Sequence, residues 1–190
     1  MRVYENPCDN YMYTFQKSGI AEAVREAGGE IFPAQVASMY QKVDVPRGRV
    51  LRNVSIVREA LEADCLINLP IAKVHGGAKL TIGLKNMMGL IWDRGFWHRN
   101  GLDACIADFA TRLRPNLVLV DATRILTTRG PQGPGDVETP HTLMASVDPV
   151  AADAYASTLF RRRPELGYLL LASRFGLGEC DLSKIKVVKV

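Results

Sequence analysis

Residues 66–89 concentrate the side chains that could do chemistry in this chain. An apolar run, CLINLP, ends at Pro70 and is followed by a short polar stretch containing Lys73, His75, Gly76, Gly77 and Lys79. Lysine ammonium groups bind phosphate and carboxylate oxygens as point charges. Glycine lets backbone N–H groups approach a ligand closely because no Cβ intervenes. We therefore expect Lys73, Lys79 and the two glycines to bind a small anion.

A helical pattern that opens at Thr81 extends this predicted anion site. The free N–H groups at the start of a helix attract negative charge. Lys85 and Asn86 follow about one turn later and are polar positions in an otherwise apolar helix, so we expect them to turn back toward the site. The competing interpretation is that Thr81 is a simple N-cap and the lysines are solvated. The phosphate-binding GxxxxGK[ST] loop and the dinucleotide-binding fingerprint are both absent from the sequence.

Acid–base groups occur near the predicted anion site. His75 and His98 are both expected in loops, where each could act as a general base or as a metal ligand, and packing is the alternative role for His98. Asp121 follows the apolar run LVLV and could orient a base or bind a polar group. Asp153 lies on a helix of small residues and is expected to face the same site. The separations between these residues match no metal-site spacing, so we assign no metal ligand.

The elements that would position these residues alternate between strand and helix. This order indicates an α/β fold with a mostly parallel sheet flanked by helices, and with a small β excursion near residues 34–55. We expect one helix over 13–27, a loop over 92–100, and a helix that begins at Asp148-Pro149. Ligands of open α/β sheets bind beyond the carboxyl ends of the strands. The strands that precede Cys8, Lys73 and Asp121 would bring these groups to one rim.

Composition restricts the class of protein. The chain has 190 residues, 47% of them hydrophobic, which fits a single α/β domain over 1–190; because the first strand begins almost at residue 1, we expect upstream N-terminal elements to be missing. A net charge of +4 is too small and dispersed to indicate nucleic acid, and the densest basic cluster, 161–163, is expected to be solvated at a helix end. No apolar run is long enough to span a membrane, and no signal peptide is evident.

Cysteine usage indicates a reducing, cytoplasmic setting. The cysteines Cys8, Cys65, Cys105 and Cys180 are far apart in the sequence and form no CxxC pair. Iron–sulfur and zinc sites are usually announced by such close pairs. We therefore expect no cofactor in this chain, with an iron–sulfur cluster only on a partner or on a missing segment.

The motifs LINLPIAKVHGGAKLTIGLKNMMG, RGFWHRN, IADFATRLRPNLVLVDATRIL, GPQG, DPVAADAYA and FGLGECDL together resemble the domain of unknown function 362 family. The most specific pieces are Lys73-x-His75, Lys85-Asn86 with Gly89, and Asp148-Pro149-Val150 with Asp153. Members are typically bacterial or archaeal, and many carry a ferredoxin-type segment or a twin-arginine signal. The resemblance implies an association with redox biology and no settled activity. This chain departs from the family in lacking the upstream strand with a Lys-Pro-Asn-type motif and the Cys-rich segment.

The sequence supports more than one function. The first hypothesis is an enzyme-like domain that binds a small anionic ligand, with the histidines moving a proton. The alternative is a non-catalytic accessory module that docks a ferredoxin-like, iron–sulfur partner through Trp92, Phe96 and Trp97, with the lysines steering an acidic surface. A metal-dependent hydrolase is a third hypothesis.

Overall fold

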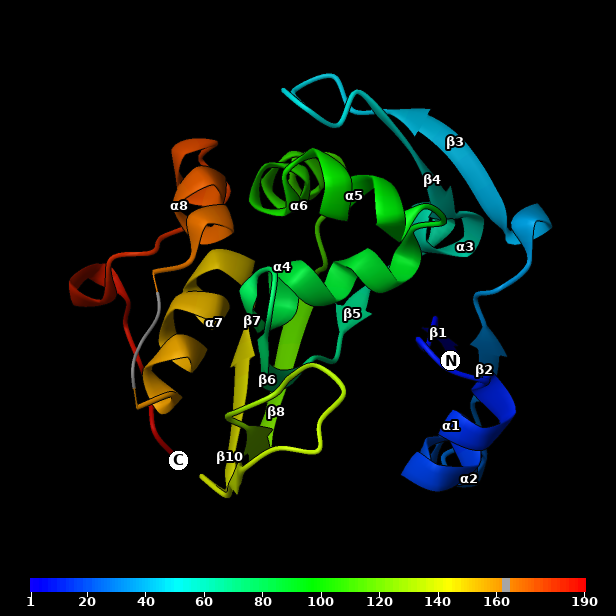
Figure 1. Ribbon diagram of the computed structural model, residues 1–190, viewed down its shortest axis with the longest axis horizontal. Helices are drawn as coiled ribbons and strands as arrows, with labels where there is room; N and C mark the ends of the chain where they lie inside the picture. The colour runs from blue at the N-terminus through cyan, green and yellow to red at the C-terminus, as the bar shows by residue number, and fades with distance from the viewer. Residues whose placement is uncertain (162–164) are drawn as a thin grey trace.

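A central β-sheet with helices packed against it forms the body of the computed structural model, which describes residues 1–161 and 165–190 (Figure 1). The longest strand, β8 (Leu117–Leu126), lies at the centre of this sheet, and the strand order is β10-β8-β6-β7 with β5 and β9 also paired to β8. The other strands are β5 (Ile67–Asn68), β6 (Ile71–His75), β7 (Lys79–Thr81), β9 (Val137–Glu138) and β10 (Thr142–Ser146). The predicted α/β class is confirmed.

Strand direction divides this sheet into a parallel centre and antiparallel flanks. The strands β5 and β6 run parallel to β8, whereas β10 and β9 run antiparallel to β8 and β7 runs antiparallel to β6. Along β8 the inward side chains Val118, Val120 and Ala122 are fully buried, as expected for alternation on a half-covered sheet. On the opposite face, Ile67 and Leu143 remain exposed.

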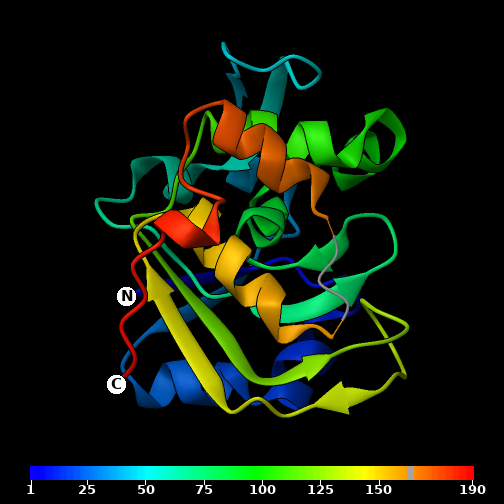
Figure 2. The same cartoon turned by 90° about the vertical axis from the view of Figure 1, so that its left-hand side faces the viewer.

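Helices cover the buried face of the sheet. Helix α7 packs against β8 and β10, and α8 packs on α6 and α7 (Figure 2). The bounds of these and the neighbouring helices are α4 (Gly83–Asn86), α5 (Arg94–Asn100), α6 (Leu102–Ala110), α7 (Pro149–Ala156) and α8 (Gly167–Arg174). Asp148 caps α7 by accepting from Val150 N at 2.8 Å, which confirms the helix start predicted at Asp148-Pro149. Short 3₁₀ turns are η1 (Ala37–Met39), η2 (Met87–Leu90), η3 (Ser157–Leu159) and η4 (Leu182–Lys184).

The N-terminal residues form a separate βααβ unit. Strands β1 (Arg2–Glu5) and β2 (Glu30–Pro33) pair in parallel, and α1 (Tyr11–Ser18) and α2 (Ile20–Glu26) connect them. The single helix expected over 13–27 is wrong, because Gly19 adopts a left-handed backbone (φ 72°) that ends α1 and starts α2. This unit lies beside the end of the main sheet, at the right of Figure 1.

A β-hairpin outside the main sheet confirms the predicted β excursion. Strands β3 (Tyr40–Asp44) and β4 (Asn53–Val57) pair antiparallel and are followed by α3 (Arg58–Glu62). The buried carboxylate of Asp108 anchors the hairpin loop to α6, because one oxygen accepts from three consecutive backbone N–H groups at 2.7–2.9 Å. The anchored hairpin forms one side of the space next to α5.

Three local predictions around the candidate site are wrong. Pro70 separates β5 from β6, so Lys73 and His75 lie on a strand and not in the loop after it. Thr81 lies in β7, and the following helix starts at Gly83. Residues 94–100 form α5 and not a loop, because the Asp93 side chain accepts from Phe96 N at 2.9 Å and caps a helix.

The sequence also predicted a solvated basic cluster over 161–163 at a helix end. Arg162 and Arg163 of that cluster lie outside the described residues. Within the described part of the chain, no helix is both long enough and apolar enough to cross a bilayer.

Candidate functional site

Lys85 is a buried cation without a carboxylate partner among the described residues. Its residue is 8% exposed, and its Nζ lies 3.0 Å from Met88 Sδ. Among residues 1–161 and 165–190, no carboxylate forms an ion pair with it. Loss of water lowers the pKa of Lys85 to about 8; the thiol of Cys8 opposes this shift, and the positive charges of Arg94 and Lys73 add to it. Buried charges are normally paired, so this ammonium group is the most unusual feature of the region.

Lys73 and Arg94 complete what we call the cationic cluster, defined as Lys73, Lys85 and Arg94. Burial lowers the pKa of Lys73, while the nearby Glu5 carboxyl and Cys8 thiol act in the opposite direction. The Arg94 guanidinium donates to the backbone oxygen of Asn6 at 3.0 Å and to its Oδ1 at 3.2 Å. The three cations come from β6, α4 and α5, so the fold brings together charges that are separate in the sequence.

The end of the first strand reaches the same cluster. Burial raises the pKa of Glu5 even though part of the residue remains exposed, and Lys73 and Arg94 counteract the rise. Cys8 Sγ lies 3.7 Å from Arg94 Nη1. The N-terminal unit therefore contributes one weakly compensating carboxyl and one exposed thiol to the cluster.

His75 has a defined tautomer. Its Nδ1 accepts from Gly77 N at 3.0 Å and from Ala78 N at 3.1 Å, so the proton of the neutral ring is on Nε2. Burial, followed by the charge of Lys85, lowers the pKa of His75 to about 4. At neutral pH this imidazole is a hydrogen-bond donor through Nε2.

His98 stacks on His75, with ring centroids 5.8 Å apart and planes inclined by 19°. It is exposed on α5, and partial burial together with Lys85 and Arg94 lowers its pKa. Burial, followed by the charges of nearby cations, therefore favours the neutral form of both imidazoles, and His98 has the freer access to solvent.

Asp121 and Lys79 do not join this cluster. Asp121 pairs with Ile71 in the middle of β8, whereas Lys73 pairs with Leu126 at the end of that strand. The Oδ1 atom of Asp121 accepts hydrogen bonds from Thr123 N at 2.8 Å and from Thr123 Oγ1 at 2.7 Å. Lys79 donates to the carbonyl oxygen of Glu165 at 2.8 Å, which draws its ammonium group away. The expectation that Asp121 ends its strand at the rim is wrong, because pairing with β6 and β9 continues β8 to Leu126.

Asp153 and Asn86 hold the helix that carries Lys85. Asp153 is fully buried, and its Oδ1 accepts from Gly83 N at 2.7 Å. Burial raises the pKa of this carboxyl to about 7. Asn86 Nδ2 donates to Asn68 Oδ1, and Asn68 Nδ2 donates to the Gly83 carbonyl oxygen, both at 2.8 Å. Both of these predicted ligand-binding residues therefore bind other protein groups. The N–H group at the start of the helix, which we expected to face an anion, donates to Asp153 instead.

The remaining predicted ligand-binding residues lie on the β6–β7 hairpin. The Gly77 N–H is used by the His75 ring, and Gly76 is exposed with open space around its Cα. Thr81 is buried at the end of β7. The sequence analysis did not identify Glu5, Asn6 or Arg94 as site residues. For Arg94, its place in the RGFWHRN motif was the one sequence feature that could have indicated a role.

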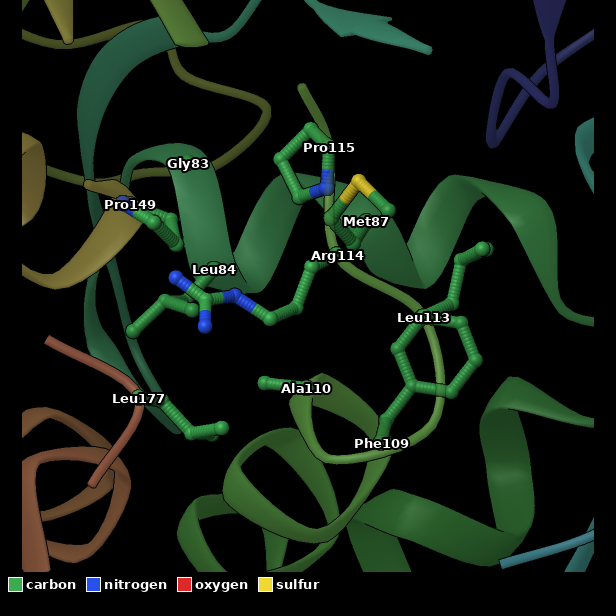
Figure 3. A pocket seen from close by; sticks show the side chains of 10 residues that line it. All are labelled: Gly83, Leu84, Met87, Phe109, Ala110, Leu113, Arg114, Pro115, Pro149 and Leu177. Atoms are coloured by element: carbon green, nitrogen blue, oxygen red, sulfur yellow. The ribbon is translucent and has the colours of Figure 1, made fainter. Parts of the chain in front are cut away.

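Two other spaces in the structure differ from this cluster. The pocket in Figure 3 is apolar and holds only about 10 Å³, roughly one water. Its labelled lining includes Leu84, Met87 and Phe109, and the Arg114 side chain reaches across it. A larger cavity of about 450 Å³ lies between β4 and α5, with Lys42, Arg52 and Trp92 among its lining residues. Trp97 also lines it but is 1% exposed and packs on Phe109 at 5.3 Å, so the expectation of an exposed Trp97 contact is wrong.

The cysteines do not fit an iron–sulfur cluster. Cys8 and Cys65 are exposed on different elements, Cys105 is buried, and Cys180 is half-buried. Within the described residues, no three side chains of His, Cys, Asp or Glu are grouped as a metal-ion site.

The sequence comparison decides the family. Residues 1–158 match the family described as "Domain of unknown function (DUF362)". The chain belongs to the DUF362 family. The matched residues include the whole cationic cluster and both stacked histidines, so the resemblance seen in the sequence motifs is confirmed.

One curated relative of this DUF362 chain is the thylakoid-associated protein sll1697 of Synechocystis sp. (strain ATCC 27184 / PCC 6803 / Kazusa). The two are 27% identical over 181 residues, which cover 77% of this chain and 56% of that protein. The chain thus spans about half the length of the relative. No solved structure matches.

Proposed function

We propose that this DUF362 chain binds a small anion, a phosphate or a carboxylate, at the cationic cluster, in an enzyme-like site. The observation that carries the proposal is the buried ammonium group of Lys85 beside Lys73 and Arg94, with no carboxylate ion pair among the described residues. Like charges in a poorly solvated region repel strongly. A bound anion would offset this repulsion and the desolvation of Lys85.

The contacts around the cluster suggest a role for each residue. The Asn6 contacts orient the Arg94 guanidinium, whose planar fork suits two oxygens of one anion. Lys73 and Lys85 supply compact charges, and His75 offers Nε2–H. His98 is the exposed neutral imidazole and is placed to accept a proton. Asp153 and Asn86 act as positioning residues because they hold α4.

Thermal unfolding with inorganic phosphate tests this proposal. Phosphate should raise the melting temperature of the wild-type chain more than sodium chloride of equal ionic strength does, because a ligand that binds only the folded state stabilises it. Lys85→Met should abolish this extra shift. Lys79→Met is the matched control, since Lys79 has the same charge but donates to Glu165 outside the cluster. A wild type that responds equally to both salts, or equal responses of the two variants, contradicts the proposal.

A second candidate function is docking of an acidic, ferredoxin-like electron-transfer partner, which would give the chain its redox association in a cytoplasmic setting. The supporting observation is the half-open cavity of about 450 Å³, where Trp92, 48% exposed, lies beside Lys42 and Arg52. Exposed aromatic groups with a basic rim suit a transient acidic partner. Trp92→Ala should weaken retention of a ferredoxin on the immobilised chain, and retention should fall with salt. Retention that is unchanged in Trp92→Ala and insensitive to salt contradicts docking here.

A further inference from the structure

Cys8 is an exposed thiol surrounded by positive charge. It lies in the connection between β1 and α1, and its Sγ is 3.7 Å from Arg94 Nη1. It is also close enough to Lys73 and Lys85 to oppose the lowering of their pKa values by burial. Cationic neighbours attract anionic reagents and substrates toward an exposed thiol.

The other cysteines lack this environment. Burial raises the pKa of Cys105 to about 11, so that thiol stays protonated. Cys65 is exposed, but it precedes β5, which pairs with the start of β8 at Leu117. The cationic cluster is at the opposite end of β8, where Lys73 pairs with Leu126. Cys65 is therefore an exposed thiol in the same chain that does not share the cluster.

The buried ammonium group of Lys85 is a second observation that favours an anionic ligand near Cys8. Lys85 is more than nine-tenths buried, and its Nζ contacts only the weakly accepting Met88 sulfur among the contacts of the described residues. A buried ammonium group needs strong acceptors to offset its lost hydration. A bound anion can supply that charge.

We propose that Cys8 is the nucleophile of this site and that the substrate is a small carboxylate or phosphate that carries an aldehyde or ketone carbon. This inference rests on the proposed anion binding. The Cys8 thiolate adds to the carbonyl carbon, so that a C–S bond forms and the C=O π electron pair moves to oxygen. The Lys85 ammonium group transfers one proton to that oxygen and gives a hemithioacetal. The step is reversible and consumes no oxidant or reductant.

The geometry assigns separate tasks to the groups around Cys8. Arg94 and Lys73 hold the anionic end of the substrate, while Lys85 stabilises the developing oxyanion as it gives up its proton. His75 Nε2–H can donate to the same oxygen, because its Nδ1 is already occupied by Gly77 and Ala78 N–H groups. This set of groups suits addition to a carbonyl carbon.

Alkylation of the native chain by a charged and a neutral reagent tests the nucleophile. Iodoacetate and iodoacetamide differ mainly in charge, and peptide mass spectrometry gives the rate of each at Cys8 and at Cys65. We expect the iodoacetate-to-iodoacetamide rate ratio to be roughly tenfold higher at Cys8 than at Cys65. Lys85→Met should bring the Cys8 ratio close to that of Cys65. Equal ratios at the two cysteines in the wild type overturn the proposal.

Protection by two matched small acids tests the substrate class. Glyoxylate has an aldehyde where glycolate has a hydroxyl group. Glyoxylate should slow iodoacetamide alkylation of Cys8 several-fold more than glycolate at equal concentration, and more than it slows alkylation of Cys65. Equal protection of Cys8 by the two acids overturns the carbonyl assignment.

The phosphate response of the wild type separates this inference from anion binding. If phosphate gives the wild type an extra thermal shift over equal-strength chloride but Cys8 shows no iodoacetate preference, the nucleophile is refuted while anion binding stands. If phosphate gives the wild type no extra shift, anion binding is itself refuted.

Discussion

Asp153 fixes the position of Lys85 through the first turn of α4. Its Oδ1 accepts from Gly83 N at 2.7 Å, two residues before Lys85, and it is fully buried between α7 and α4. The carboxyl group is 70 residues from its backbone partner in the sequence. This backbone contact therefore holds Lys85 in a poorly solvated position, and Asp153 forms no ion pair with the Lys85 ammonium group.

Removing this contact should destabilise the fold. Asp153→Ala leaves buried N–H groups of Gly83 and Leu84 without an acceptor, which costs about 2–3 kcal/mol of unfolding free energy in urea titration. Asp153→Asn keeps an acceptor oxygen and should cost less than the Ala variant. Equal stability of wild type and Asp153→Ala would show that the contact is not needed to hold α4.

The pH dependence of that contact has a definite sign. Because the pKa of Asp153 rises from 3.8 to about 7 on folding, the folded chain holds a proton that the unfolded chain releases between these values. The stabilisation of the folded state by the protonated Asp153 carboxyl group is complete below pH ~4 and is lost as pH rises to about 7. The stability of wild type minus that of Asp153→Asn should fall over this interval, as measured by urea titration at several pH values. A flat difference contradicts the assignment.

Lys85→Met should stabilise the chain while it removes anion binding. The pKa of Lys85 falls from 10.5 to about 8 on folding, so the charged amine costs on the order of 3 kcal/mol below pH 8. Methionine removes that cost at similar volume, and we expect a gain of about 1–3 kcal/mol at pH 7 in chemical denaturation. Wild-type stability should recover between pH ~8 and ~10.5, where the folded amine is already neutral. A Lys85→Met variant less stable than wild type at pH 7 would argue against an uncompensated charge.

His75 should stay neutral far below the usual range. Its pKa of about 4 lies below the ordinary 6.5, so the folded chain binds fewer protons than the unfolded chain between these values. Stability should therefore fall as pH drops from about 6.5 to 4. ¹⁵N NMR of the ring should show an unprotonated Nδ1 and a protonated Nε2 at pH 7, with a midpoint near 4. A midpoint near 6.5, or a proton on Nδ1, would contradict the hydrogen bonds from Gly77 and Ala78.

Gly83 should not tolerate a side chain, whereas Gly89 should. A Cβ at Gly83 would lie 2.8 Å from Asp153 Oδ1 and 3.0 Å from Val118 Cγ1, while a Cβ at Gly89 meets nothing within 4 Å. Gly83→Ala should cost about 1–3 kcal/mol by displacing α4, and it should weaken phosphate binding. Gly89→Ala should stay within about 0.5 kcal/mol of wild type in the same urea titration. Similar losses in both variants would refute the close packing at Gly83.

The residues of the cluster were predictable only in part. Lys73, His75 and Lys85 are close together in the sequence, so their residue types alone suggested a shared anion site. Arg94 could not be placed in this way, because its orienting partner Asn6 is 88 residues away. Glu5 was missed for the same reason: its proximity to Lys73 depends on how the N-terminal unit, whose β1 contacts η2, packs on the rest of the chain.

The wrong expectations share a physical cause. The apolar run LVLV suggested that a strand ends before Asp121, but pairing with β9 and β6 extends it to Leu126. Asp153 was expected to face a ligand because it is polar among small residues, yet it faces the backbone of α4. Strand length and the direction of a buried polar group both depend on partners that local patterns do not identify. The α/β class was predictable because the alternation of strands and helices is itself local.

Calorimetric titration of inorganic phosphate into wild type, Lys85→Met and Lys79→Met tests the central claim most directly. The wild type and Lys79→Met should bind one phosphate per chain with similar affinity, and Lys85→Met should lose at least tenfold in affinity although it remains folded. Phosphate binding that is absent from the wild type, or that is as tight in Lys85→Met as in Lys79→Met, would contradict an anion site built around Lys85.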